Sequence, residues 1–352
     1  MDGNNPLESA SAPISPRAIS RILHFATSYQ VSQALYVAAR LGIADLLKNG
    51  PLTVGEMAIA TKVQENALYR LLRALASIGV FHEIEPDRFA LTPEARALQR
   101  RPDSLRDVVL WTANPFHYRA YAHLQDCVGT GQPQYFQSGD PPIFERLKRD
   151  PEMSDAFHGS LTTMTALAIP AILAKYDFAG IQTVVDVAGG HGYLLTAILE
   201  QYPEAKGVLC ELPYVTEGAS ERVRSLGLQT RCRVVPNDFF ASIPSGGDLY
   251  IFKNVVHDWP DDRSLLILRN CHKAINESHN PRAKLLLVEM VVSTANRFDA
   301  AKWMDIEMLA LTGGRERDEN EYRTLLGDAG FRVTRVLATD ALLSIIEAAP
   351  QA

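Results

Sequence analysis

Apolar residues recur at helical spacing in the first part of the chain. Between residues 19 and 47 they fall three or four positions apart, which predicts helices with a wide buried face. Thr53 precedes Glu56 at capping-box spacing, and two further helical segments follow. Residues 80–84 and 88–91 then predict two short strands joined by a tight turn. Helix, turn, helix and a two-stranded wing form the winged-helix pattern.

A winged helix can bind DNA or pack against another subunit, and its charges distinguish the two uses. Residues 53–97 contain five Lys or Arg and six Asp or Glu, and acidic residues crowd the tip of the wing. Binding to a phosphate backbone normally requires an excess of positive charge. We therefore expect a dimerisation domain rather than a DNA reader. The second helix offers an apolar surface for packing against another subunit, formed by Leu68, Leu71, Leu72 and Leu75.

Residues 104–176 are predicted to be mainly helical, with loops where Gly and Pro cluster at 129–133 and 139–142. This region has an unusual share of aromatic residues and histidines. Such residues can form an ordinary core, and they can equally form the wall of a pocket for a flat, mostly apolar ligand. Both interpretations stay open. The residues concerned are Trp111, Phe116, His117, Tyr118, Tyr121, His123, Phe136, Phe144, Phe157 and His158.

From residue 182 onward, short apolar runs alternate with helical segments. Runs that are apolar throughout are typical of strands buried on both faces, as in a parallel sheet between two layers of helices. The last two runs, 331–339 and 341–348, could close the sheet as a hairpin. The pattern predicts a Rossmann-like, doubly wound α/β domain. Its parallel strands are expected within residues 183–190, 207–212, 232–238, 248–256 and 283–292.

The length of 352 residues suggests two or three domains at about 150 residues each. The first 17 residues are rich in Ser, Pro, Asn and Ala without periodicity, which is typical of a flexible arm. We expect a winged-helix-like dimerisation domain at 18–103 and a helical linker and pocket wall at 104–176. The Rossmann-like domain is expected at 177–352.

Charge and cysteine content narrow the class of protein further. The chain has 35 Lys or Arg and 41 Asp or Glu, for a net charge of −6, so nucleic acid is an unsuitable partner. The four cysteines form no C-x-x-C pair, which favours free thiols in a reducing compartment. Neither a signal peptide nor an uninterrupted apolar run of about 18 residues is present. We expect a cytoplasmic protein with no membrane partner and no metal site.

The ends of the first three strands of this domain indicate a cofactor site. Ligands of such sheets bind at the carboxyl ends of the strands. The first strand ends at Asp186 and runs into a turn with three glycines, where the backbone can approach a ligand closely. Glu211 ends the second strand, where it can accept hydrogen bonds from ribose hydroxyls, and Asp238 precedes Phe239, a pair that suits adenine. These features predict an adenosine-containing cofactor; the glycines are Gly189, Gly190 and Gly192.

The first of these acids narrows the choice of cofactor. A dinucleotide fingerprint leaves the helix N-terminus free for a pyrophosphate. Asp186 lies three residues before Gly189, where it would repel phosphate and suit a cofactor with a cationic amino group. This favours S-adenosylmethionine.

Six motifs together resemble the class I S-adenosylmethionine-dependent O-methyltransferases that act on small aromatic molecules, a family with caffeic-acid-type and anthracycline-type members. The motifs are VVDVAGGHG, CELPYV, NDFF, FKNVVHDWPDD, LLLVEMVV and DIEMLALTGGRERDENEYRTLLGDAGF, and the match spans roughly residues 20–345. The chain departs from the family pattern at Ala188, where a first glycine is usual, at Glu211, where Asp is commoner, and at Asn237, where Gly is usual. Ala188 bears on how closely the turn can approach the cofactor.

The resemblance implies roles for particular residues. His257, followed by Asp258 and Trp259, matches the family's catalytic base, and Glu289 and Glu316 match the acids that orient it. Lys253, and Leu212 beside Glu211, match cofactor contacts. The resemblance places the substrate-binding wall at Phe157, Leu161, Met164, Asp258, Met304 and Met308, with Trp111 and Phe116 as further candidates.

Elementary chemistry agrees with a histidine base. The cofactor already has an activated methyl group, so the protein must position the acceptor and remove its proton. A phenol has a pKa near 10, and only about one molecule in a thousand is ionised at neutral pH. Histidine, with a pKa near 6.5, is a suitable base, and a carboxylate on its other ring nitrogen fixes the tautomer.

The leading hypothesis is a homodimeric O-methyltransferase, joined through its N-terminal domain, that methylates a phenolic hydroxyl of a small aromatic secondary metabolite. Two alternatives remain. The chain could bind S-adenosylmethionine and perform other chemistry, such as N-methylation, hydroxylation or a pericyclic step. It could also be a winged-helix regulator that senses the cofactor.

Overall fold

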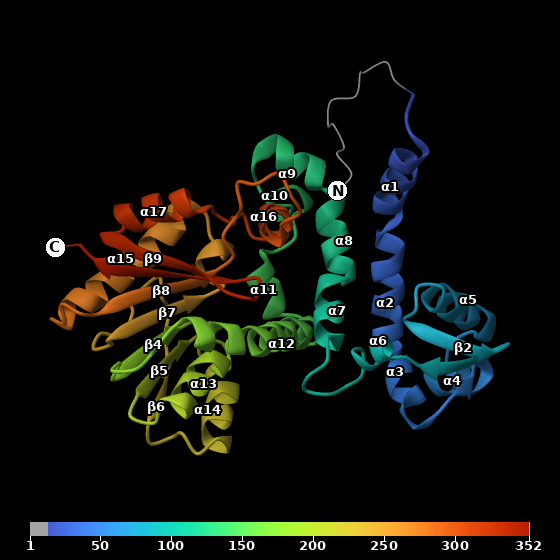
Figure 1. Ribbon diagram of the computed structural model, residues 1–352, viewed down its shortest axis with the longest axis horizontal. Helices are drawn as coiled ribbons and strands as arrows, with labels where there is room; N and C mark the ends of the chain where they lie inside the picture. The colour runs from blue at the N-terminus through green and yellow to red at the C-terminus, as the bar shows by residue number, and fades with distance from the viewer. Residues whose placement is uncertain (1–12, 352) are drawn as a thin grey trace. The chain divides into compact units, whose positions relative to one another are not determined.

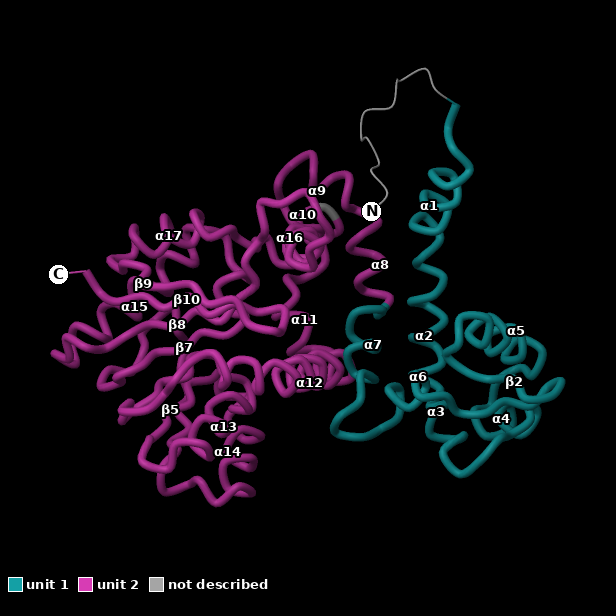
Figure 2. Tube along the Cα trace, viewed as in Figure 1, with its two compact units in different colours: residues 1–114 teal, residues 115–352 magenta. Residues whose placement is uncertain are grey.

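The computed structural model describes residues 13–351, which divide between residues 114 and 115 into two compact units (Figure 2). Most of the expected arm, residues 1–12, lies outside the described residues. The division falls later than the boundary expected at 103/104. The cause is helix α7 (Arg106–Thr112), which packs on α2 (Tyr29–Leu41) within the first unit, where Gln33 also donates a hydrogen bond to the carbonyl of Ala113 at 2.8 Å.

The first unit contains the predicted winged helix. Thr53 and Glu56 form a reciprocal capping box at the start of α4 (Val54–Thr61), as their spacing predicts. Strands β2 (Phe81–Glu85) and β3 (Arg88–Leu91) form the wing and pair antiparallel, with β1 (Leu52–Thr53) on the other side of β3. The other elements are α1 (Pro16–Thr27), α3 (Ile43–Leu46), η1 (Leu47–Asn49), α5 (Glu65–Ala76) and α6 (Pro93–Arg96).

The second unit begins with the predicted helical region. The two predicted loops contain Gly131 and Gly139, each of which ends a helix with a positive φ. The helices are α8 (Pro115–Ala122), α9 (Leu124–Thr130), α10 (Tyr135–Ser138), α11 (Ile143–Leu147) and α12 (Pro151–Lys175). By length and composition alone α12 could cross a membrane, a test that core helices also pass. It packs on α13 (Tyr193–Gln201), and Ala168 and Ile172 on α12 belong to the core.

A seven-stranded sheet forms the centre of this unit, in the order β6-β5-β4-β7-β8-β10-β9 (Figure 1). The first five strands in this order are parallel, and the last two form the predicted antiparallel hairpin. The doubly wound α/β fold expected from the sequence is therefore confirmed. The strands are β4 (Thr183–Val187), β5 (Lys206–Glu211), β6 (Cys232–Pro236), β7 (Leu249–Lys253), β8 (Lys284–Glu289), β9 (Phe331–Ala338) and β10 (Ser344–Pro350).

Helices cover both faces of the sheet, and each face has its own hydrophobic core. Helices α12, α13 and α14 (Thr216–Ser225) contribute to one core, and α15 (Asp261–Glu277) and α17 (Glu319–Asp328) to the other. Helix α16 (Ala300–Leu311) adds Ala301 to the first core. The chain starts the sheet at β4, builds outward to β6 and then returns to β7. This reversal beside β4 is where open α/β sheets bind ligands. All four cysteines are buried free thiols.

Candidate active site

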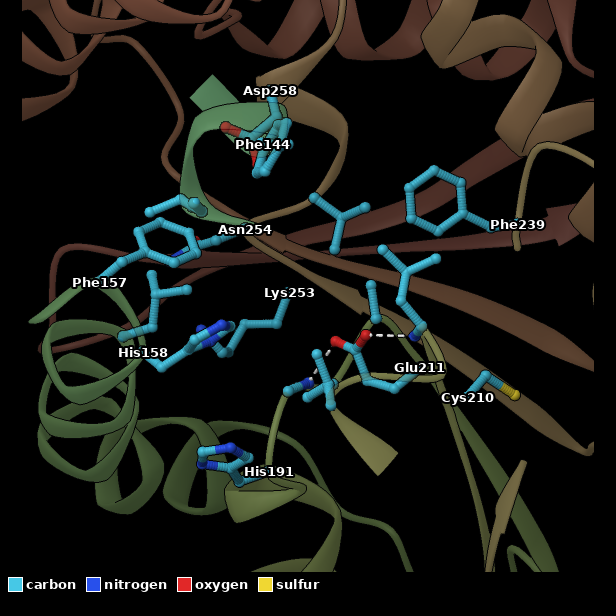
Figure 3. A pocket seen from close by; sticks show the side chains of 18 of the residues that line it. Phe144, Phe157, His158, His191, Cys210, Glu211, Phe239, Lys253, Asn254 and Asp258 are labelled. Atoms are coloured by element: carbon cyan, nitrogen blue, oxygen red, sulfur yellow. Dashed lines mark hydrogen bonds between the residues drawn. The ribbon is translucent and has the colours of Figure 1, made fainter. Parts of the chain in front are cut away.

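A cavity of about 410 Å³ opens at the carboxyl ends of β4, β5, β6 and β7, and the second unit alone forms it (Figure 3). Strand ends form its floor, and α11 and α12 contribute aromatic side chains from the other side. Ten residues that the sequence nominated line this cavity: Gly189, Gly190, Glu211, Leu212, Asp238, Phe239, Lys253, Asp258, Phe157 and Leu161.

The glycine turn after β4 folds closely over Asp186. A Cβ on Gly189 would overlap the Asp186 carboxylate, so only glycine fits there. Ala188 has a φ of 56°, a left-handed conformation that costs a non-glycine residue about 1–2 kcal/mol. The departure from the family glycine is therefore accommodated with strain, and the turn still lines the cavity.

Asp186 is buried beneath this turn at 1% exposure. Neither carboxylate oxygen has a hydrogen bond of ordinary length to the described residues. Burial raises the pKa of Asp186 to about 7, while the positive charge of Lys253 acts in the opposite direction and Glu211 adds to the rise. A buried acid without hydrogen bonds costs free energy, which a cationic ligand group would offset.

Glu211, at the end of β5, is held by the backbone. Its Oε1 accepts the N–H of Gly190 at 3.0 Å and its Oε2 accepts the N–H of Leu212 at 2.6 Å. Burial raises the pKa of Glu211, and these two hydrogen bonds oppose that rise. Each oxygen retains a lone pair for a hydroxyl donor in the cavity.

Asp238 and an aromatic cluster follow β6. Asp238 accepts the N–H of Phe240 at 2.9 Å, which fixes the turn. The rings of Phe239 and Phe240 meet Trp259 edge to face, and Phe144 from α11 stacks on Trp259 with ring centroids 5.6 Å apart. The cavity therefore has an apolar, flat-sided end next to the Asp238 carboxylate.

Lys253 ends β7 between two carboxylates, Asp186 and Glu289. Burial lowers the pKa of Lys253, and both carboxylates oppose the decrease. Its ammonium therefore compensates charge on both sides of the cavity floor.

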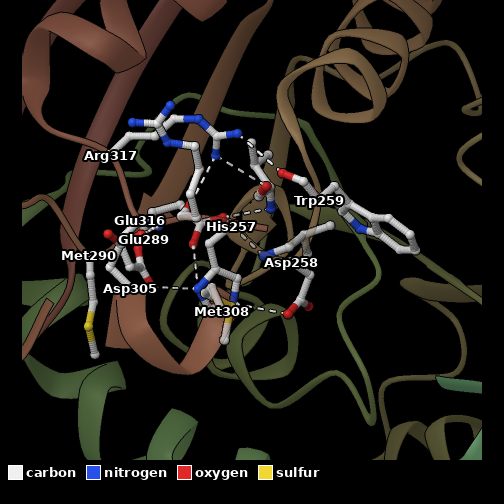
Figure 4. A network of polar contacts seen from close by, with 12 residues as sticks. His257, Asp258, Trp259, Glu289, Met290, Asp305, Met308, Glu316 and Arg317 are labelled. Atoms are coloured by element: carbon white, nitrogen blue, oxygen red, sulfur yellow. Dashed lines mark hydrogen bonds and ion pairs between the residues drawn. The ribbon is translucent and has the colours of Figure 1, made fainter. Parts of the chain in front are cut away.

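His257 lies in the 3-10 turn η2 (Val256–Asp258), directly after β7 (Figure 4). Its Nδ1 is 2.6 Å from Oε1 of Glu316 and 4.0 Å from Oε2 of Glu289. Because an ionised carboxylate only accepts, Nδ1 donates to Glu316. Its Nε2 is 3.8 Å from Oδ1 of Asp258. The ring is not part of the cavity lining, although Asp258 is; 11% of the His257 side chain stays exposed.

The surrounding carboxylates control the protonation of His257. Burial alone lowers its pKa, but Glu289, Asp258 and Glu316 more than offset this effect and raise the pKa of His257 to about 10. Burial in turn raises the pKa of Glu289 to about 7, against the attraction of His257. The imidazole of His257 therefore binds its proton more tightly than a free imidazole does.

Glu289 contacts the backbone of the histidine turn. Its Oε1 accepts the N–H groups of Val255 and Val256, both at 2.9 Å, while its Oε2 has no hydrogen bond to the described residues. Glu289 thus fixes the start of the turn that places His257, whereas Glu316 binds the ring itself.

The loop that carries Glu316 passes directly over the histidine turn. The N–H of Arg315 donates to the carbonyl of His257 at 2.8 Å, and a Cβ on Gly314 would overlap that carbonyl. Asp305 accepts the N–H of Glu316 at 2.9 Å. The second glycine of the GGRER motif is therefore required for this close approach.

Arg317 contacts the turn that contains His257, and the sequence did not indicate this contact. It is 1% exposed, and its guanidinium donates to Asp261 at 2.7 Å and to the carbonyls of Val256 at 3.4 Å and Trp259 at 3.2 Å. These two carbonyls flank the segment that contains His257. The guanidinium thus bridges the two ends of the turn. Its ion pair with Asp261 connects positions 56 residues apart in the sequence.

Five of the residues nominated for the substrate wall lie outside the cavity lining. Met308 is buried close to His257 (Figure 4), Met304 packs against the core, and Met164 is half-buried on α12. Phe116 is buried beneath the guanidinium of Arg146, 4.9 Å from its ring centre. Trp111 belongs to the first unit. Among the described residues, no group of three or more His, Cys, Asp or Glu is arranged to hold a metal.

Some lining residues were not nominated as site residues. Phe144 and His158 belong to the aromatic and histidine-rich region noted in the sequence, and His191 lies within the glycine motif, so a signal existed for each. Tyr214 and Trp259 also line the cavity.

Known proteins resemble this chain along nearly its whole length. A family model described as an O-methyltransferase domain matches residues 121–332, and one described as an O-methyltransferase dimerisation domain matches residues 23–101. The phenazine O-methyltransferase of Lysobacter antibioticus is 40% identical over 94% of this chain and 96% of its own. The mitomycin biosynthesis 6-O-methyltransferase of Streptomyces lavendulae is 35% identical over 88% of each chain. An amine-methylating relative, the 8-amino-8-demethylriboflavin N,N-dimethyltransferase of Streptomyces davaonensis, is 30% identical over 94% of this chain and 95% of its own.

Solved structures agree. The crystal structure of LaPhzM matches with a TM-score of 0.90 and 40% identity, covering 94% of this chain and 99% of that chain. An O-methyltransferase from neocarzinostatin biosynthesis, solved with S-adenosylmethionine and 2-hydroxy-5-methyl naphthoic acid, matches with a TM-score of 0.80 and 30% identity, covering 97% and 100%.

Proposed function

The chain belongs to the S-adenosylmethionine-dependent O-methyltransferases that have an N-terminal dimerisation domain, and on this premise we propose that it methylates a phenolic hydroxyl of a small aromatic secondary metabolite. The observation that carries the proposal is the buried contact between His257 and Glu316, next to Asp258, which lines the cavity. A histidine oriented by a carboxylate is suited to take a proton from a hydroxyl.

The cavity fits S-adenosylmethionine at three points. Glu211 has free lone pairs for the ribose hydroxyls, Asp238 and Phe239 offer a carboxylate and a ring face to adenine, and the unsatisfied oxygens of Asp186 suit an ammonium group. When bound, S-adenosylmethionine supplies a methyl group activated on a sulfonium. We assign the glycine turn, Leu212 and Lys253 to the same site, with the glycines Gly189, Gly190 and Gly192.

His257 removes the proton of the acceptor hydroxyl. With Nδ1 donating to Glu316, Nε2 is the nitrogen that can receive the proton. An unperturbed imidazole is about 3.5 pKa units less basic than a phenolate, which is worth about 5 kcal/mol. The neighbouring carboxylates raise the pKa of His257 to about 10 and so reduce this difference. Only the neutral ring can take the proton, so turnover should increase as pH rises toward this pKa.

Glu316 and Glu289 are positioning residues in this mechanism. Glu316 fixes the ring tautomer and stabilises the imidazolium. Glu289 holds the backbone of the turn and adds negative charge near the ring. We assign the acceptor wall to Phe157, Leu161 and Asp258, which line the cavity, and to Met308 beside His257. Roles for Met164, Met304, Phe116 and Trp111 stay predictions.

The dimerisation domain leads us to propose a homodimer. Helix α1 has no buried residue, and it exposes Ile19, Ile22, Leu23 and Phe25. A second copy of the chain would cover this apolar surface. Light scattering at micromolar concentration should report a dimer, and a monomer would contradict the assembly.

The proposal is tested by incubating the protein with methyl-labelled S-adenosylmethionine and paired aromatic acceptors. Each pair has one skeleton that bears either a hydroxyl or an amine, and methylation is read by mass spectrometry. We expect label on the hydroxyl. Label only on the amine would favour N-methylation, the second candidate, which the 30% identical amine-methylating relative makes worth including. No transfer to any acceptor, with the cofactor bound, would refute both.

A further inference from the structure

Two histidines in the cavity have no part in the chemistry described above. His158 lies on α12 and His191 lies in the glycine turn, and both line the cavity (Figure 3). Their ring centroids are 5.8 Å apart with an angle of 31° between the planes. Neither imidazole has a hydrogen bond to another residue of the described range 13–351; their contacts are ring contacts, including Phe157 against His158.

The two histidines lie at a defined end of the cavity. Figure 3 shows Phe239 on one side of Glu211, and His158 and Lys253 on the opposite side, with His191 below them. A nucleoside held by Glu211 and Phe239 would therefore extend its substituent toward the histidines. Asp186, buried under the turn that contains His191, has unsatisfied oxygens at this same end.

The amino-acid tail of S-adenosylmethionine has an ammonium and a carboxylate, which require partners of opposite charge. Asp186 suits the ammonium. We propose that His158 and His191 together form the subsite for the carboxylate of this tail, each donating a ring N–H to it. The inference rests on the proposed cofactor site and adds a specificity for the amino-acid end of the cofactor.

The glycine at position 218 supports a defined place for His191. An added Cβ on Gly218 would lie 3.0 Å from Nε2 of His191, closer than side-chain contacts normally are. A side chain at position 218 would displace the imidazole of His191. Glycine at this position leaves room for the imidazole beside α14.

The surroundings of the pair set its response to pH. Burial lowers the pKa of His158, His191 adds to the decrease and Asp155 opposes it. Burial and Arg222 both lower the pKa of His191. Asp186 is buried beneath the cavity floor, and the other charged residues of the lining are Glu145, Lys148, Glu211, Asp238, Lys253 and Asp258. An entering carboxylate favours the protonated imidazoles, so its contribution to binding should increase as pH falls.

Calorimetry on the full chain with three ligands separates the carboxylate from the rest of the cofactor. The ligands are S-adenosylhomocysteine, its decarboxylated analogue, which keeps the amine, and methylthioadenosine, which lacks the tail. In the double variant His158→Leu, His191→Leu, we expect Kd for S-adenosylhomocysteine to rise about 10- to 100-fold, as for the loss of hydrogen bonds to a charged group. The Kd values of the other two ligands should stay within about twofold, since neither has the carboxylate.

Controls distinguish a carboxylate contact from a structural effect. The variants His158→Gln and His191→Asn, which keep an N–H donor, should recover part of the affinity, and His272→Leu, in a ring that packs on Phe331 away from the cavity, should change nothing. In the wild type, the preference for S-adenosylhomocysteine over its decarboxylated analogue should be larger at pH 6 than at pH 8.

Equal loss of all three ligands, or no loss of any, in the double variant would overturn the carboxylate subsite. Failure of methylthioadenosine and S-adenosylhomocysteine to bind the wild type would instead refute the proposed cofactor site. The two failures are therefore distinguishable.

Discussion

The two ends of the cavity floor are built in different ways. At the nucleoside end, backbone N–H groups of neighbouring turns hold the carboxylates of Glu211 and Asp238, whose remaining lone pairs face the cavity. At the other end, side chains from distant parts of the sequence hold His257 and Arg317 in a buried network. The first end is arranged to bind a ligand and the second to fix one ring and its proton.

This difference predicts that binding and turnover can be damaged separately. A carboxylate that faces the ligand contributes mainly to affinity, because backbone N–H groups of the protein already hold it in place. A residue of the buried network contributes mainly to the pKa and position of His257. Four changes test this separation, from the largest expected effect to the smallest.

Replacing His257 by Ala should have the largest effect. Loss of the general base should lower kcat about 10²- to 10⁴-fold, while Kd for S-adenosylhomocysteine stays nearly unchanged. Turnover on a phenol and calorimetry give the two values, and His272→Ala, outside the cavity, serves as control. Unaltered turnover would remove His257 from the mechanism.

Arg317→Met should lower both stability and kcat. The change leaves the carbonyls of Val256 and Trp259 without this donor, and the loss of hydrogen bonds from a charged group costs about 1.5–3 kcal/mol. The ion pair with Asp261, whose side chain is 59% exposed, adds at most about 1 kcal/mol. Denaturant unfolding should show this loss.

The control for this change is Arg323→Met, which breaks only an exposed ion pair with Glu319, worth at most about 1 kcal/mol. If Arg317→Met does not fold, Arg317→Lys keeps the charge but not the forked geometry. It should lower kcat more than it raises Kd for S-adenosylhomocysteine. A change in Kd alone would contradict a role at the histidine end.

Glu211→Ala tests the nucleoside end. If this carboxylate binds the ribose, its loss should cost about 1.5–3 kcal/mol of cofactor affinity, as for hydrogen bonds to a charged group. Calorimetry with S-adenosylhomocysteine measures the loss, and kcat at saturating cofactor should change little. Unchanged affinity would reject the ribose contact.

Ala188→Gly should have the smallest effect. Glycine relieves the left-handed strain at φ 56°, while its greater freedom in the unfolded chain takes back about 0.4–1 kcal/mol. The net gain in the free energy of unfolding should be about 1 kcal/mol or less. Ala188→Val, which keeps a Cβ and adds branching, should instead destabilise the protein. Equal stability of both variants would show that the turn is not strained.

The comparison also explains what the sequence could predict. Asp186, Glu211 and Asp238 were recognisable because each ends a buried strand, and parallel strands end at one edge of a sheet. The capping box at Thr53 and the hairpin that closes the sheet were predictable because each joins residues that are close in the sequence.

The contacts around His257 could not be predicted from where strands end in the sequence. Nothing near Arg317 in the sequence indicates that its guanidinium reaches Val256 and Trp259, because that contact depends on how the loop after α16 passes over η2. Glu289 was nominated as an acid that orients the ring; its Oε1 hydrogen bonds instead go to the backbone of the turn. The packing of α7 on α2, beyond the expected boundary at 103/104, is likewise a contact between segments distant in the sequence.

The central claim is that surrounding carboxylates raise the pKa of His257 above that of a free imidazole and so make it a stronger base. Its direct test is an NMR titration of the labelled imidazole in the wild type and in Glu316→Gln. We predict that the wild-type pKa lies well above 6.5, that turnover rises with pH as the ring loses its proton, and that loss of the Glu316 charge moves this pKa downward. A wild-type pKa at or below 6.5, or one that does not change in Glu316→Gln, would contradict the account.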